Sequence, residues 1–303
     1  MSVLSGLVPV FLLLALGVAA RQWGLLDRSA AVGLNRLVAN IALPALLLLK
    51  VGTSPLDVNF SLRTTLVTSV VTLGVAVVAM AGAVLWRLPR PQQGVLAQAA
   101  MRGNVAFVAF PIILAGVGEQ GLRMAVVTAA VLIPVMNLLA VLALEAARGE
   151  GEPIGRIAFR VVVNPMVLGA TAGLPLAALH WQPWPWLGST LGILADFSLP
   201  AALLALGAQL ELRRWAPVWR QTAVVTAAKL AVLPALGWWA LRATGASRLE
   251  LAVGVLLLAA PTAVASYPVA AELDGDTDFA GACVLVTTVA SVVGYVAWAL
   301  VLG

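Results

Sequence analysis

The sequence predicts an all-α integral membrane protein with ten transmembrane helices, arranged as two inverted repeats of five, in which helices four and nine are broken and cross. Composition, segment length and an internal repeat all support this fold. Hydrophobic residues make up 62% of the 303 residues and charged residues 10%, with a mean hydropathy of +1.02. Soluble domains contain about 45–50% apolar and about 25% charged residues. The composition therefore excludes an ordinary soluble enzyme or binding domain.

Ten apolar segments are long enough to cross a bilayer, which takes about 20 helical residues. They lie near residues 3–20, 33–50, 64–86, 94–117, 122–145, 160–179, 187–210, 219–241, 250–272 and 279–302. None has the alternating pattern of a transmembrane β-strand. The first could be a signal peptide, but no Lys or Arg precedes its apolar run, and it has a partner in the repeat, so we expect a spanning helix.

The internal repeat has an offset of about 156 residues. Matching positions include Pro9 and Pro165, Gly17 and Gly173, Pro44 and Pro200, and Pro111 and Pro268. Each copy holds five segments, and because five is odd the second copy must face the opposite way in the membrane. Inverted repeats of this kind are typical of secondary transporters.

The distribution of Lys and Arg predicts that both termini are non-cytoplasmic. With the N-terminus outside, five cations fall in outer loops and two, Arg102 and Lys229, fall inside spans. The other eleven fall in inner loops: Arg21, Arg28, Arg36, Arg87, Arg90, Arg148, Arg156, Arg160, Arg213, Arg214 and Arg220.

The fourth and ninth segments carry the best candidates for a binding site. Proline breaks or kinks a helix, and in lipid the freed backbone groups must face protein or a wet cavity. Inversion symmetry would bring the midpoints of the two segments together, with half-helix N-termini directed at one point, which favours an anion. Polar side chains at that depth are Asn104, Thr262 and Ser266. Alternatively, the prolines only kink the two helices for packing and mark no binding site.

Two cations and one anion lie deep in the spans. Arg102 and Lys229 each cost roughly 2.5–3.5 kcal/mol at mid-membrane and so need a partner or a cavity. Asp196 is the one deep acid, and Asn40 occupies its matching position. The cations could receive a substrate carboxylate or cap helix carbonyls. Asp196 could pair with Lys229, which we prefer, or carry protons.

Other chemistries have little support in this sequence. The single cysteine, Cys283, excludes a disulfide framework, and the single histidine, His180, removes most zinc and triad chemistry, so we expect no metal and no cofactor. The pI near 10.3 is compatible with nucleic-acid binding, but the arginines are spread over short loops and we expect no nucleic-acid partner.

Several motifs together resemble the auxin efflux carrier family, which includes plant auxin exporters and bacterial malonate-type permeases. The resemblance covers essentially the whole chain. Its motifs are residues 9–17, 37–49, 103–111 (Gly-Asn-Val-Ala-Phe-Val-Ala-Phe-Pro), 118–121, Asn164-Pro165, 198–207, 229–234 and Ala260-Pro261-Thr262.

The resemblance implies the fold of bile-acid sodium symporters and sodium/proton antiporters. Residues 1–50 and 160–212 would form a scaffold, and residues 60–147 and 218–303 a moving core. By family pattern Asn104, Pro111, Pro261 and Thr262 fall at the crossing. The chain lacks the long central loop of the plant exporters, and Arg102 and Pro268 depart from the expected pattern.

The sequence therefore predicts an inner-membrane transporter, an exporter of a small mono- or dicarboxylate, working by elevator-type alternating access. The expected substrate-binding residues are Arg102, Gly103, Asn104, Pro111, Pro261, Thr262 and Ser266. Uncoupled or proton-linked movement is favoured over sodium coupling, because no acid lies at mid-depth in the core segments. A homodimer is one option for assembly. A membrane-embedded receptor without transport is the alternative; an enzyme would need paired catalytic groups at one depth.

Overall fold

The computed structural model describes residues 3–53, 61–149, 155, 159, 162–209 and 218–303. These residues form helices and connecting segments, with one isolated β-bridge and no strand among them. The chain divides into two compact units, and each is described separately below. Unit 1 comprises Met1–Leu62, Ala106–Ala130 and Val162–Leu210, and unit 2 comprises Arg63–Val105, Val131–Val161 and Glu211–Gly303.

Six helical stretches within the described residues are long and apolar enough to cross a membrane, so this is a multi-pass membrane protein. They are Arg28–Gly52, Leu62–Leu85, Glu119–Arg148, Pro185–Gln209, Trp219–Ala243 and Thr277–Leu302. Shorter apolar helices accompany them at Phe11–Gln22, Val105–Val117 and Pro165–Ala178.

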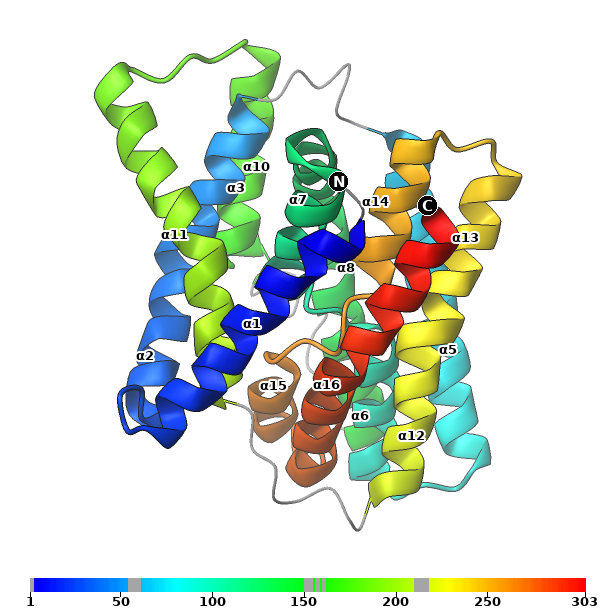
Figure 1. Cartoon of the computed structure of the whole chain (residues 1–303). Helices are drawn as coiled ribbons and strands as arrows, with labels where there is room; N and C mark the ends of the chain where they lie inside the picture. Colours follow the sequence, from blue (N-terminus) through cyan, green and yellow to red (C-terminus); the bar gives the residue numbers. More distant parts are fainter. Residues whose placement is uncertain (1–2, 54–60, 150–154, 156–158, 160–161, 210–217) are drawn as a thin grey trace. The chain divides into compact units, whose positions relative to one another are not determined.

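Unit 1 is built on two helix pairs (Figure 1): α1 packs against α11, and α3 packs against α10. Its elements are α1 (Val3–Gln22), α2 (Arg28–Leu37), the π-helix η1 (Val38–Ala42), α3 (Leu43–Gly52), α7 (Phe110–Val117), the first part of α8 (Glu119–Arg148), α10 (Pro165–Ala178) and α11 (Pro185–Gln209).

Glycines allow both pairs to approach closely. A Cβ on Gly207 would lie 2.1 Å from the Leu14 carbonyl oxygen, and one on Gly173 would lie 2.7 Å from the Val51 Cβ. Small residues of this kind let helix backbones pack tightly in membranes, where apolar burial gives little drive for association. A Cβ on Gly17 would lie 3.1 Å from the Gly207 Cα. Gly17 matches Gly173 in the internal repeat and Val51 matches Gly207, so the Gly17–Gly207 and Gly173–Val51 contacts correspond to each other.

Unit 2 packs its helices around α16 (Thr277–Leu302), which contacts α6, α12, α14 and α15. Asp276 caps the start of α16 by accepting from the Phe279 N–H, and Ser247 and Glu250 form a capping box at the start of α14. The other elements are α5 (Leu62–Leu85), α6 (Arg90–Met101), the second part of α8, α12 (Trp219–Ala227), the π-helix η4 (Ala228–Val232), α13 (Leu233–Ala243), α14 (Arg248–Leu258) and α15 (Ser266–Glu272).

Each of the three π-helical segments in the described part of the chain ends two residues before a proline. The prolines are Pro44 after η1, Pro111 after η2 (Val105–Ala109) and Pro234 after η4. A proline has no N–H to donate, and its ring clashes with the carbonyl four residues earlier. Widening the preceding turn by one residue relieves that clash, which is a common origin of π-bulges.

Two of the predicted spans are interrupted. In the fourth, α6 ends at Met101 and helical structure resumes at Val105; in the ninth, α14 ends at Leu258 and α15 begins at Ser266. Pro268 lies after its break in the first turn of α15, where a missing N–H removes no helical bond, whereas Pro111 follows η2 within the continuous helical stretch Val105–Val117. The chain between the half-helices therefore runs without regular helix over Arg102–Asn104 and over residues 259–265.

Glycine packing in unit 1 gives a direct test. We expect Gly207→Ala to lower the melting temperature of the purified protein, because the added Cβ would overlap the Leu14 carbonyl oxygen, and overpacking costs about 1–3 kcal/mol. Gly192→Ala is the control in the same helix, since a Cβ at that position would have nothing within 4 Å. Equal melting temperatures for the two variants in detergent would contradict the close α1–α11 contact.

Candidate functional site

The two helix breaks meet in unit 2 and hydrogen-bond to each other. The Asn104 N–H donates to the Pro261 carbonyl at 2.7 Å, and the Ala263 N–H donates to the Arg102 carbonyl at 3.0 Å. These bonds form an antiparallel bridge between Gly103 and Thr262. Each interrupted segment thus supplies partners for the backbone groups that the other has freed, as a low-dielectric interior requires.

Thr262 ties this bridge to two neighbouring helices. Its hydroxyl donates to the Ala99 carbonyl in the last turn of α6 at 2.9 Å, and its N–H donates to the Thr287 hydroxyl of α16 at 3.0 Å. Thr287 could not be singled out from the sequence, because one threonine in an apolar span carries no distinctive signal. Thr262 is fully buried and its proton is in use, so toward a ligand its hydroxyl can only accept.

Arg102 is held in place by neutral groups. Its Nη2 donates to the Asn137 Oδ1 of α8 at 2.7 Å, and its Nη1 donates to the Ala265 carbonyl at 3.3 Å. The residue is 8% exposed. Arg102 therefore brings a positive charge to the bridge without a carboxylate to match it among the described residues of unit 2.

Lys229 reaches the same place from η4. It is fully buried, and its Nζ donates to the Leu258 carbonyl, the last of α14, at 2.9 Å. A Cβ on Gly103 would lie 3.3 Å from this Nζ, so the glycine makes room for the ammonium. No carboxylate among the described residues of unit 2 pairs with Lys229, and within that unit the two cations give the bridge a local positive excess.

Three buried polar atoms around the bridge have no hydrogen-bond partner within the described part of the protein. They are the Asn104 Nδ2, the Ser266 Oγ and the Gln98 Oε1. Gln98 is otherwise engaged, because its Nε2 donates to the Ser266 carbonyl at 3.1 Å. Buried polar groups are rarely left unpaired, and an amide donor, a hydroxyl and two cations are gathered at this bridge, a set of groups whose chemistry suits an anion.

The predicted site residues thus divide into two groups. Arg102, Gly103, Asn104, Pro261, Thr262, Ser266 and Lys229 all lie at the bridge in unit 2. Pro111, Asn40 and Asp196 belong to unit 1, in α7, η1 and α11, and their part in the site stays a prediction. Asn40 donates to the Arg36 carbonyl of its own helix at 2.8 Å, and Asp196 is exposed.

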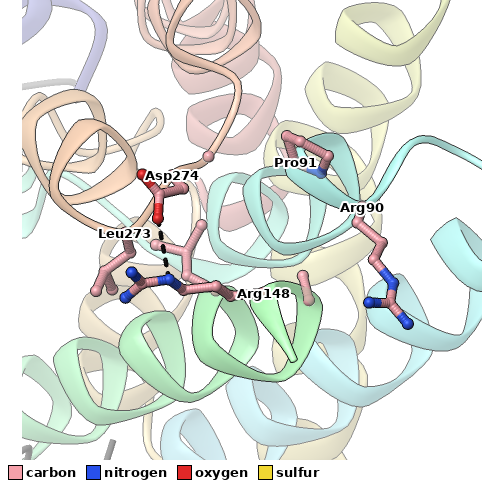
Figure 2. Close-up of a pocket in the computed structure, with 8 residues that line it drawn as sticks. Arg90, Pro91, Arg148, Leu273 and Asp274 are labelled. Atoms are coloured by element: carbon pink, nitrogen blue, oxygen red, sulfur yellow. Dashed lines mark ion pairs between the residues drawn. The ribbon is translucent and has the colours of Figure 1, made fainter. Parts of the chain in front are cut away.

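A second feature of unit 2 is a surface cavity of about 150 Å³ between the start of α6, the end of α8 and the α15–α16 loop (Figure 2). The Arg148 Nε lies 2.9 Å from the Asp274 Oδ2, and in Figure 2 the Arg90 side chain points away from this ion pair. Since one of its two arginines is already neutralised, the cavity offers an anion much less than the bridge does.

Comparison with known proteins points to transport. A family model described as membrane transport protein matches residues 2–299. A protein of Methanothermobacter thermautotrophicus described as an uncharacterized transporter is 25% identical over 300 residues, covering 97% of each chain. A protein of Rhizobium meliloti provisionally named a malonate transporter is 28% identical over 306 residues, covering 96% of this chain and 93% of the relative.

The role of Thr262 in the bridge can be tested by substitution. We expect Thr262→Val to destabilise the protein by about 1–3 kcal/mol, because it leaves the Ala99 carbonyl buried without a partner. Thr262→Ser keeps the hydroxyl and should retain most of the stability. Chemical denaturation followed by tryptophan fluorescence would compare the two. A valine variant as stable as the serine variant would show that this hydrogen bond does not hold the bridge together.

Proposed function

The chain belongs to the membrane transport protein family, the auxin efflux carriers that its motifs resemble, and we propose that it carries a small organic anion across the bacterial inner membrane. The substrate class is a mono- or dicarboxylate. The provisional name of the Rhizobium relative supports a dicarboxylate of the size of malonate.

The observation that carries this proposal is the unmatched charge at the bridge. Arg102 and Lys229 are both buried, and their hydrogen bonds go to carbonyl and amide oxygens. Holding a cation at mid-membrane costs roughly 2.5–3.5 kcal/mol, so such residues usually face a partner or a polar pathway. A bound carboxylate would supply the missing counter-charge, and the Asn104 amide and the Ser266 hydroxyl would donate hydrogen bonds to it.

The architecture that suits this function is the ten-helix inverted repeat with crossed helices four and nine. Supporting it are the contact between the two breaks and the matching glycine contacts of α1–α11 and α10–α3. In this proposal residues 1–50 and 160–212 form the scaffold. Residues 60–147 and 218–303 form the core, which carries the bridge from one membrane face to the other. Both termini lie on the non-cytoplasmic side.

Efflux is the direction that needs no further energy source. Moving one negative charge out of a cell with a negative interior releases about 2.3 kcal/mol per 100 mV. A facilitative exporter can use this potential directly, and a proton-linked mechanism is the next option. The alternative function, a receptor that binds the same anion without moving it, would use the same site and differ only in flux.

Transport is the first prediction to test. Full-length protein in proteoliposomes should take up radiolabelled malonate saturably, driven by an inside-positive potential. Asn104→Ala should reduce uptake about tenfold, since it removes a buried amide donor that has no other partner. Asn35→Ala, on the α2 helix of unit 1, serves as the control. Saturable binding of malonate without any flux would contradict the transporter and favour the receptor.

The charge at the bridge can be altered without touching the cations. In Asn137→Asp a carboxylate would stand about 2.7 Å from the Arg102 Nη2, and the resulting ion pair should keep the fold while cancelling one positive charge. We expect the malonate Kd to rise about tenfold or more, measured by isothermal titration calorimetry. Asn137→Ser, which is neutral, should have a smaller effect; equal affinities in the two variants would argue against charge as the basis of binding.

A further inference from the structure

The carbonyl end of α14 holds a buried cation. The last carbonyls of any helix lack intrahelical donors and carry partial negative charge. At the end of α14 the Leu258 carbonyl accepts from the Lys229 ammonium, at 2.9 Å. The fully buried amino group of Lys229 thus lies against the negative end of a broken helix beside the bridge.

The other broken helix ends differently. In the last turn of α6 the Ala99 carbonyl accepts from the neutral Thr262 hydroxyl. At the offset of 157 residues that relates Pro111 to Pro268, the counterpart of Lys229 is Thr72 of α5, whose hydroxyl bonds the Thr68 carbonyl of its own helix. The carbonyl end of α14 therefore accepts a hydrogen bond from a cation and that of α6 from a hydroxyl, although both helices end at an interruption of a membrane-spanning segment.

Two local features deliver this cation. Lys229 lies in η4, the widened turn before Pro234, and Gly103 leaves the space that the Nζ occupies. A Cβ at position 103 would stand 3.3 Å from the Nζ and 3.2 Å from the Ala260 Cβ. The backbone of η4 thus brings the ammonium to this position, and Gly103 has no Cβ to crowd it.

In secondary transporters with broken helices, carbonyl ends of this kind coordinate the coupling sodium ion or proton. We propose that the Lys229 ammonium is a tethered cation that replaces a dissociable coupling cation at the end of α14, so that anion movement requires no sodium. This inference rests on the proposed transport function. Because the ammonium is covalently attached, it cannot bind from one side of the membrane and be released on the other. It stays with the protein in both directions of its movement.

The test is to remove the tether and supply the cation from solution. Lys229→Ala deletes three methylenes and the ammonium, which n-propylammonium replaces group for group. We expect malonate uptake by this variant to fall about tenfold or more in choline buffer and to recover several-fold with n-propylammonium or Na⁺ at about 100 mM. Wild-type uptake should be equal in sodium and choline. Lys229→Met, which fills the space without a charge, should be inactive under all conditions.

A second measurement does not depend on transport. Na⁺ or n-propylammonium should raise the melting temperature of Lys229→Ala in detergent, because a ligand bound only to the folded state stabilises it. It should leave wild type and Lys229→Met unchanged, and n-propanol should have no effect on any of them. A folded Lys229→Ala that gains neither uptake nor stability from the cations would overturn the proposal, as would sodium-dependent uptake by wild type. Cation-specific stabilisation in the absence of any wild-type uptake would support the tethered cation and count against the transport function alone.

Discussion

Hydrogen bonding of the backbone at two interrupted helices is the constraint on which the rest of this structure depends. Within the hydrocarbon region of a membrane, no water is present to hydrogen-bond an unpaired N–H or carbonyl. The chain meets this constraint by pairing the two breaks with each other, through Asn104 with Pro261 and Ala263 with Arg102. Side chains donate hydrogen bonds to carbonyls at the helix ends: the Thr262 hydroxyl at the end of α6 and the Lys229 ammonium at the end of α14.

The same arrangement generates the chemistry of the site. Lys229 donates to the carbonyl end of α14 and so places a charge beside the bridge. Arg102 adds a second charge, and its hydrogen bonds go only to neutral oxygens. Neither group has a carboxylate partner among the described residues of unit 2. What stabilises the broken helices therefore also makes their meeting point attractive to an anion.

The membrane-spanning character of the chain and the place of its two interrupted segments could be predicted from the sequence, because long apolar segments and prolines in repeated positions constrain a membrane protein strongly. The sequence located the two interrupted segments and the polar residues Asn104, Thr262 and Ser266 beside their breaks. It did not reveal the partners that fix them. An asparagine within a span favours an interhelical hydrogen bond, which Asn137 makes, but the sequence does not identify Arg102 as its partner. Thr287 meets Thr262 through tertiary packing, and no local pattern marks it out. The π-helical turns were also unforeseen: three precede prolines, yet Pro134 and Pro200 lie within continuous α-helices, so proline alone does not specify them.

The measurement that tests the central claim most directly is the position of a bound anion. Crystals of the protein grown with bromomalonate would locate the bromine by its anomalous scattering. We predict a peak beside the Gly103–Thr262 bridge, with carboxylate oxygens in hydrogen-bonding reach of Arg102 and Asn104. A single peak elsewhere, such as the cavity beside Arg90 and Arg148, with the bridge unoccupied, would contradict that prediction.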